Sequence, residues 1–147
     1  MQTISYEQDI IAWANQQAEL IRSGNFALLD LEHLADEIED VGKSEQREFV
    51  RRMAVFLADL LKWQLQMKGR RANWNEIIKN QRISVLKHLQ RTPSLELMLS
   101  DIEWQEDIWS DAVARASEET GLSDFPKTCP WTMQQILSQD WLPGETG

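Results

Sequence analysis

Apolar residues recur along the chain at intervals of three and four, and this spacing is typical of amphipathic helices. Strict alternation, which would indicate strands, is almost absent. The first helix is predicted to begin at the capping box of Ser5 with Gln8 and to end at Gly24, because glycine readily adopts the left-handed conformation of a helix terminus. A second helix is predicted between Asp30, which can cap its first turn, and Gly42. The pattern thus divides the first part of the chain into two short helices.

The third predicted helix, from a cap at Ser44 to about Met67, is apolar over more than half of its circumference. Its main stripe and the edge of that stripe consist of Val50, Met53, Ala54, Leu57, Leu60 and Leu61, with Phe49, Phe56, Trp63 and Met67. A helix of this kind has to be covered by several neighbours. We therefore expect it to form the centre of the fold.

Two further long helices are predicted after a turn. The fourth begins at a second capping box, Asn73 with Glu76, and ends just before Pro93. Its buried face is expected to hold Trp74, Ile77, Ile78, Val85 and Leu89, together with the polar Gln81 and His88. The fifth runs from Pro93, which loses no hydrogen bond at a first helical position, to Thr120, with Gly121 as its stop.

The fifth predicted helix is apolar on two sides. One stripe contains Leu95, Leu99, Ile102, Trp109, Val113 and Ala116, and nearly opposite it lie Leu97, Trp104 and Ile108. A helix apolar on two sides needs two partners. One would be the core, and the other would be a second subunit or the C-terminal tail. Leu97, Trp104 and Ile108 are therefore candidate interface residues.

The tail is expected to fold back onto the helices. A short helix is predicted from Pro130 to about Ser138, and Trp131 and Trp141 are suited to anchor it. The resulting prediction is an all-α fold, an up-and-down helical bundle of about five helices with a short C-terminal helix folded back. We expect a single domain over residues 1–147, with 142–147 as a flexible tail.

Composition narrows the classes of protein. The single cysteine, Cys129, excludes an intrachain disulfide and any multi-cysteine zinc or iron–sulfur site. No long uncharged apolar run and no basic leader followed by an apolar segment occurs, so we expect a cytoplasmic protein of bacterial type with no membrane span. The sequence contains no G-x-S-x-G nucleophile elbow, no glycine-rich phosphate-binding loop and no dinucleotide-binding motif. Nothing marks Cys129 as an activated nucleophile.

Charge is distributed unevenly within the net charge of −9. Residues 43–92 hold 12 basic and 4 acidic residues, giving +8, while the rest of the chain holds 3 and 20, giving −17. One interpretation is that acidic helices pack beside basic ones, within the fold or across a dimer. The other is a basic turn, with Lys68, Arg70 and Arg71, that contacts phosphate or nucleic acid. The acidic remainder and the lack of a recognition helix count against the second.

The segment from Asp30 to Asp40 contains six carboxylates and His33. These polar residues lie away from the apolar stripe of the same helix, which consists of Leu31, Leu34, Ile38 and Val41. A solvated face is therefore favoured over a metal site built from His33 with Asp36, Glu37 or Asp40. The other histidine, His88, falls on an apolar face and is interpreted as a packing residue. No metal and no cofactor are predicted.

Glu106 and Gln81 fall inside apolar stripes. A buried carboxylate costs several kcal/mol unless a cation pairs with it. Glu106 is therefore expected either to pair with an arginine or to be less buried than its spacing suggests. The candidate partners are Arg47, Arg52 and Arg82. A structural ion pair is the favoured interpretation, and a catalytic carboxylate with a perturbed pKa is the alternative.

Several motifs together resemble the bacterial family catalogued as domain of unknown function 29. They are "YEQDIIAWANQQAELIRSG", "DLEHLADEIEDVGKSE", "LLKWQ", "IIKNQR", "TPSL" and "FPKTCPWT", in the family's order from about Tyr6 to Trp141. The resemblance implies an all-helical bundle and no established function. The family often places a histidine just before "LLKW", where this chain has Asp59. If that histidine serves the family as a metal ligand or a base, the role is lost in this chain or is taken over by the Asp59 carboxylate.

Residues of this chain that match the family's recurrent polar and aromatic positions are Asp9, Trp13, Asp30, Glu37, Lys62, Trp63, Trp74, Arg82 and Trp131. The three tryptophans Trp13, Trp63 and Trp74 are interpreted as core residues. Glu37 borders the apolar stripe of its helix, and we expect it to pair with an arginine of the basic segment.

Protein–protein contact, with self-association through the second stripe of the fifth helix, is the favoured function. The alternative is a bundle enzyme or metal-binding protein that uses Glu37, Asp59, His33 or Glu106, which requires these groups to converge in one cleft. A third possibility is phosphate contact through the basic turn.

Overall fold

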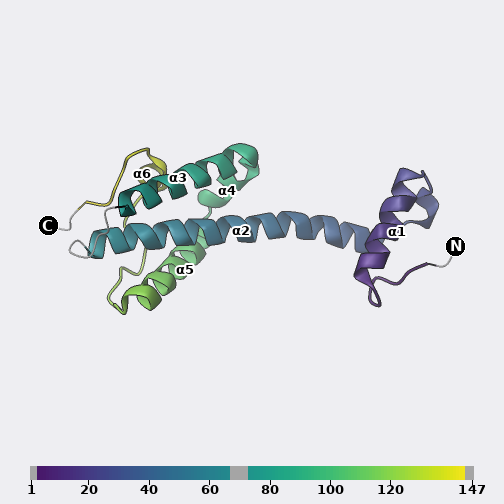
Figure 1. Cartoon of the computed structure of the whole chain (residues 1–147), viewed down its shortest axis with the longest axis horizontal. Helices are drawn as coiled ribbons and strands as arrows, with labels where there is room; N and C mark the ends of the chain where they lie inside the picture. The colour runs from purple at the N-terminus through teal and green to yellow at the C-terminus, as the bar shows by residue number, and fades with distance from the viewer. Residues whose placement is uncertain (1–2, 67–72, 145–147) are drawn as a thin grey trace. The chain divides into compact units, whose positions relative to one another are not determined.

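The computed structural model describes residues 3–66 and 73–144, and every regular element in these ranges is helical (Figure 1). The predicted all-α class is confirmed. The elements are α1 (Ile10–Arg22), η1 (Phe26–Leu28), α2 (Leu31–Leu65), α3 (Trp74–Arg91), η3 (Pro93–Leu95), α4 (Glu96–Leu99), α5 (Ile102–Thr120) and α6 (Met133–Leu137). Contacts divide the chain into two compact units, Met1–Glu45 and Gln46–Gly147. The single domain expected from the length stays a prediction.

The first helix begins later than predicted. Its N-cap is Asp9, whose side chain accepts a hydrogen bond from the Ala12 N–H at 3.0 Å, whereas the Ser5 hydroxyl bonds to Glu7. The predicted capping box at Ser5 is therefore wrong. Asp9, four residues later, supplies an equivalent acceptor directly at the start of the helix. The stop is confirmed, since Gly24 adopts a φ of 78° just after α1.

The second and third predicted helices are one continuous helix, α2. Its start at Asp30 is supported, because Asp30 Oδ1 accepts a hydrogen bond from the His33 N–H at 3.3 Å. The break expected at Gly42 and Ser44 is wrong. Glycine in a helix interior costs only about 1 kcal/mol, and no proline removes a hydrogen bond here, so the helix continues through both residues. α2 contributes residues to both units.

The core of the second unit surrounds the later part of α2, as predicted. Phe49, Phe56, Leu57, Leu60 and Leu61 are fully buried in a cluster that also takes in residues of α3, η3, α4, α5 and α6. In Figure 1, α3 and α5 lie on opposite sides of this part of α2. Coverage from several sides explains why so much of the helix is apolar.

The fourth predicted helix is α3, although its capping box is not formed. Asn73 occupies the cap position without a side-chain hydrogen bond. Ile78, Val85 and Leu89 are buried as expected, and His88 packs edge-on against Phe49 with ring centroids 5.4 Å apart. Two positions differ from the prediction, because Ile77 is 41% exposed while Arg82 is buried.

The long fifth helix is interrupted. The chain forms η3 and α4, breaks at Ser100 and Asp101, and starts again as α5. Asp101 causes this restart because its side chain caps α5, accepting a hydrogen bond from the Glu103 N–H at 2.9 Å. The stop at Gly121 is confirmed by its φ of 75°.

This break removes the second stripe expected on that helix. Leu97 is 78% exposed, Trp104 is half-buried against the core, and Ile108 is completely buried within it. The three side chains do not share one surface, because Leu97 lies before the break and the other two lie after it.

The tail docks through its tryptophans, as predicted. Trp131 contacts Trp109 and Trp141 edge-on, with ring centroids 5.7 Å apart in each pair. α6 is shorter than expected and begins at a capping box of Thr132 with Gln135. Its Ile136 is fully buried in the core of the second unit.

A buried guanidinium holds the chain after α6. Arg82 is 3% exposed, and its Nε donates to the carbonyl oxygen of Ile136 at 2.9 Å while Nη2 donates to that of Trp141. The guanidinium also lies 5.3 Å from the centre of the Phe56 ring. Burial lowers the pKa of Arg82, and the nearby Asp140 carboxylate opposes that effect. Arg82 thus joins α3, α2 and the tail.

Replacement of Arg82 by methionine keeps the apolar length of the side chain but removes both donors. We expect the free energy of unfolding to fall by about 2–3 kcal/mol, because hydrogen bonds to charged groups are among the stronger ones and two carbonyls lose their partner. Urea unfolding followed by tryptophan fluorescence measures this change. Lys79→Met, at an exposed position of the same helix, is the control. Equal stability of the two variants would contradict the role given to Arg82.

Candidate functional site

A network of polar side chains in the first unit surrounds His33. Its Nδ1 lies 2.7 Å from Asp30 Oδ2, and its Nε2 lies 3.3 Å from Glu7 Oε1. The Tyr6 ring stacks on the imidazole at a centroid distance of 4.2 Å. Asp30 also accepts a hydrogen bond from Trp13 Nε1 at 3.0 Å. The network therefore fastens the segment before α1 to the start of α2.

Glu37 belongs to the same network. Its Oε1 accepts a hydrogen bond from the Tyr6 hydroxyl at 2.5 Å. The partner is thus a phenol from the same unit and not the arginine expected from the charge pattern. The sequence separation of 31 residues explains why no local pattern could identify Tyr6.

These contacts shift two pKa values upward. The hydrogen bond that His33 donates to the Asp30 carboxylate raises the pKa of His33, against the opposing effect of burial. The hydrogen bond to Glu37 raises the pKa of Tyr6 to about 12. No three His, Cys, Asp or Glu side chains group as metal ligands within the described ranges 3–66 and 73–144. The arrangement is a structural connection in which each charged group has a partner.

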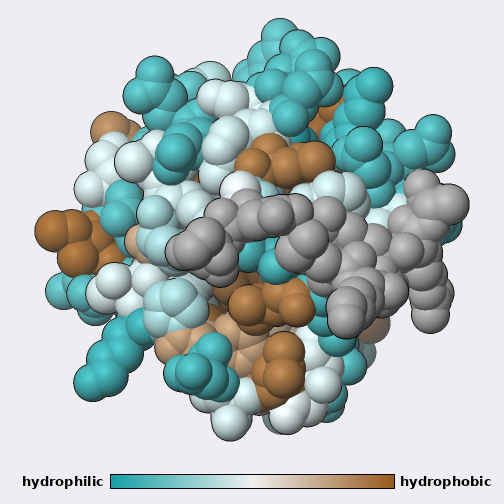
Figure 2. All heavy atoms as spheres, turned by 90° about the vertical axis from the view of Figure 1, so that its left-hand side faces the viewer, coloured by the Kyte–Doolittle hydropathy of each residue, from teal (hydrophilic) through white to brown (hydrophobic). Residues whose placement is uncertain are grey.

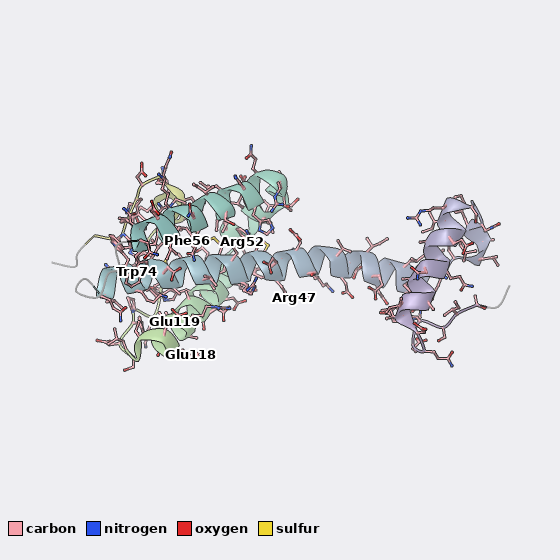
Figure 3. All side chains as sticks on the ribbon, viewed as in Figure 1. Arg47, Arg52, Phe56, Trp74, Glu118 and Glu119 are labelled. Carbon is pink, nitrogen blue, oxygen red and sulfur yellow. The ribbon has the colours of Figure 1, made fainter. Side chains whose placement is uncertain are left out.

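A second polar cluster, in the second unit, centres on Lys62. Its Nζ lies 2.8 Å from Asp59 Oδ1, bonds to Glu119, and stands 5.9 Å from the centre of the Trp74 ring. Trp74 comes from α3 and Glu119 from α5, on either side of α2 (Figure 3). Burial would lower the pKa of Lys62, but the two carboxylates outweigh that effect and raise it. Asp59 is therefore engaged in an ion pair.

Glu106 borders a different cavity from Asp59. It is exposed, the second of the two outcomes expected for it, on a groove of about 730 Å³ between α5 and the tail. Apolar side chains of this groove include Leu57, Leu99, Trp109, Trp131 and Met133. Cys129 lies in the same wall, where burial raises the pKa of its thiol. The carboxylates Asp59 and Glu106 do not meet in one cleft.

The basic turn lies outside the described residues. Lys68, Arg70 and Arg71 all fall within 67–72, so phosphate contact there stays a prediction.

On the face that Figure 2 shows, apolar side chains form separate groups between polar ones.

The apolar stripe in the first part of α2 is formed by Leu31, Leu34, Ile38 and Val41. Leu31 is 70% exposed, Ile38 71% and Val41 72%, and only Leu34 is half-buried. The periodicity identified the stripe, and three of its four side chains are largely exposed. Glu32 and Glu39 are exposed on the side of the helix that is turned away from the stripe, and a Cβ added at Gly42 would meet no atom within 4 Å. This part of α2 is an uncovered acidic and apolar surface.

The helical elements, and the core that the helices of the second unit share, define an all-α protein of the helical-bundle class. The chain belongs to the family described as domain of unknown function DUF29, whose model matches residues 5–142. Neither the curated proteins nor the solved structures contain a match to it. In the described part of the chain, no helix has both the length and the apolar character needed to cross a bilayer.

The chain holds one tyrosine, so ultraviolet absorbance of tyrosinate reports on Tyr6 alone. We expect a pKa of about 12, raised by the hydrogen bond to Glu37. The Glu37→Ala variant should titrate nearer to the ordinary value of 10.0. Because the folded pKa is raised, this bond stabilises the fold below the ordinary pKa, and the stabilisation is lost as pH rises through about 12. Identical titration curves for the two proteins would contradict the contact.

His33 offers a second titration, measured by NMR of the two histidines. Its pKa should lie above the ordinary value of 6.5, and Asp30→Asn should lower it while leaving the His88 signals unchanged. Protonated His33 stabilises the fold below the ordinary pKa, and this stabilisation is lost as pH rises through the raised pKa. A His33 pKa at or below the ordinary value would count against the network.

Proposed function

We propose that this protein acts by binding another protein chain through the apolar stripe of α2. The observation that carries the proposal is the exposure of Leu31, Ile38 and Val41, each about 70% accessible on one face of a regular helix. Scattered exposed apolar residues are ordinary, but a contiguous row on one helix face marks an interaction surface.

The spacing of the stripe suits a helical partner. Its residues follow intervals of three, four and three, which are the a and d positions of two consecutive heptads. Such positions pack against another helix or into a groove. The row from Leu31 to Val41 extends over roughly 15 Å at the rise of an α-helix.

Burial of the stripe would supply enough free energy to offset the cost of bringing two chains together. Each leucine, isoleucine or valine side chain contributes about 1.5–3 kcal/mol when it is fully buried. Part of this offsets the lost freedom of the two chains. The expected complex is therefore of moderate affinity and depends on the apolar contacts.

The polar candidates support a binding role over catalysis. Asp59 is paired with Lys62, and Glu37 accepts the Tyr6 hydroxyl, so each carboxylate already has a partner within the chain. Glu106 is exposed and lies on a separate groove. A single cysteine suits a reducing compartment, and the cytoplasm remains the proposed location.

A labelled synthetic helix of leucine and lysine in a heptad pattern is a direct probe of the stripe. We expect the full chain to bind it, and Ile38→Gln with Val41→Gln to weaken binding by about tenfold or more, because two buried apolar contacts are lost. Fluorescence anisotropy measures the affinity. A peptide of the same composition in scrambled order separates apolar recognition from simple charge attraction.

Leu97→Gln is the matched control, since it removes a similarly exposed apolar side chain from the second unit. It should leave peptide binding unchanged. The proposal fails if the unmodified chain does not prefer the patterned peptide, or if the double variant binds as tightly as the control.

A further inference from the structure

We infer that the groove between α5 and the tail binds a small zwitterion with an apolar body, the chemistry of an apolar amino acid or of a short apolar peptide with free ends. The groove belongs to the second unit and the stripe to the first, so this inference is independent of the proposed function. The volume of the groove, about 730 Å³, lies within the range of roughly 300–1,000 Å³ that is typical of small-molecule sites.

The bottom of the groove is apolar. Leu57, Leu99 and Trp109 line it and are at the same time buried members of the core of the second unit. Met133 and Trp131 add to the lining, and the Trp131 ring stands nearly perpendicular to that of Trp109, at 89°. An apolar group that enters the groove therefore leaves water for an aliphatic and aromatic surface, which is favourable.

Hydrogen bonds hold the walls of the groove in place. Trp109 Nε1 donates to the carbonyl oxygen of Pro126 at 2.9 Å and so joins α5 to the tail. Gln105 Nε2 donates to the carbonyl oxygen of Leu99 across the break between α4 and α5. The site is therefore formed before a ligand arrives, and the protein loses little freedom when one binds.

Each wall of the groove carries one charged residue. Glu106 lines it from α5 and Lys127 from the tail, and both are exposed. The ion pairs among the described residues of the second unit involve other side chains, so neither Glu106 nor Lys127 has a charged partner there. Trp109 lies one helical turn after Glu106, and its indole N–H binds the carbonyl of Pro126, which directly precedes Lys127. Both charged residues are thus attached to the chain close to the Trp109 indole.

This combination selects a ligand with two opposite charges. A cation would be attracted by Glu106 and repelled by Lys127, and an anion would meet the reverse. An uncharged apolar molecule would use only the bottom of the groove. A zwitterion can pair its carboxylate with Lys127 and its ammonium group with Glu106 while its apolar body contacts the tryptophans. Because both protein charges are exposed, each pair adds only a few-fold to the affinity.

The dipeptide L-leucyl-L-phenylalanine is a suitable probe, titrated into the full chain by isothermal titration calorimetry. We expect saturable binding at one site. The N-acetylated dipeptide lacks the ammonium group, and the dipeptide amide lacks the carboxylate. Each should bind about two- to fivefold more weakly than the dipeptide, as expected for the loss of one exposed ion pair. Free L-phenylalanine distinguishes the two sources of this chemistry, because equal affinity would indicate an amino acid and weaker binding a peptide.

Variants of the two charged residues show which end each one binds. Lys127→Met should weaken binding of the dipeptide by the same factor and leave binding of the amide unchanged, since the amide has no carboxylate. Glu106→Gln should do the same for the dipeptide and the N-acetylated form. Glu118→Gln, at an exposed position of α5 outside the groove, is the matched control and should change neither affinity. A general loss of structure would not produce this crossed dependence.

NMR of the tryptophan indole N–H groups locates the site. Among the seven tryptophans, the signals of Trp109 and Trp131 should shift with the dipeptide, while that of Trp13 in the first unit should not. The inference is overturned if the dipeptide does not bind at millimolar concentration, or if all three forms of it bind equally well. It is also overturned if Lys127→Met and Glu106→Gln weaken every form alike, or if the Trp109 and Trp131 signals stay in place.

Discussion

A helix that is apolar around most of its circumference is stable only where several neighbours cover it, and this requirement organises the second unit. Between Phe49 and Leu61, α2 is enclosed by side chains of α3, α5 and α6 and of the short helices between them. The tail has to return to the helices to complete the enclosure. Ile136 and the two tail tryptophans supply the apolar part of that cover, and Arg82 holds the backbone that carries them.

Much of the fold could be predicted from the sequence, because burial leaves a periodic signature. The rows containing Phe49, Phe56 and Leu60 on α2, or Ile78 and Val85 on α3, were recognisable from spacing alone. Helix boundaries were less predictable, since they depend on differences of about 1 kcal/mol. Gly42 was expected to end a helix and does not, whereas Asp101 starts one where none was expected.

The candidate site was predictable only in part. The stripe from Leu31 to Val41 could be identified as an apolar face, but a pattern cannot tell whether anything covers it. Contacts over long sequence distances were also beyond reach. Glu37 bonds to a residue 31 positions away, and Arg82 bonds to carbonyls 54 and 59 positions away. The family resemblance drew attention to both positions without revealing their partners.

The polar clusters and the stripe illustrate two different uses of a side chain. The carboxylates of Asp30, Glu37 and Asp59 are engaged within the chain, where they position backbone segments and hold their neighbours. The side chains of Leu31, Ile38 and Val41 have no such internal role, since most of their surface is accessible. The clusters therefore position segments of the fold, whereas the stripe would supply apolar contact area to the partner that we propose.

The bonds that Arg82 forms with the tail have a consequence for variation among related chains. Both acceptors are backbone carbonyls, which every residue possesses, so Arg82 recognises the path of the tail and not its side chains. Where burial does not restrict them, residues between Ile136 and Trp141 are free to diverge while the attachment persists. One position is restricted, because Asp140 adopts a φ of 66°. Asparagine and glycine tolerate that conformation and β-branched residues do not, so in related chains with this attachment position 140 should be confined to a few residue types.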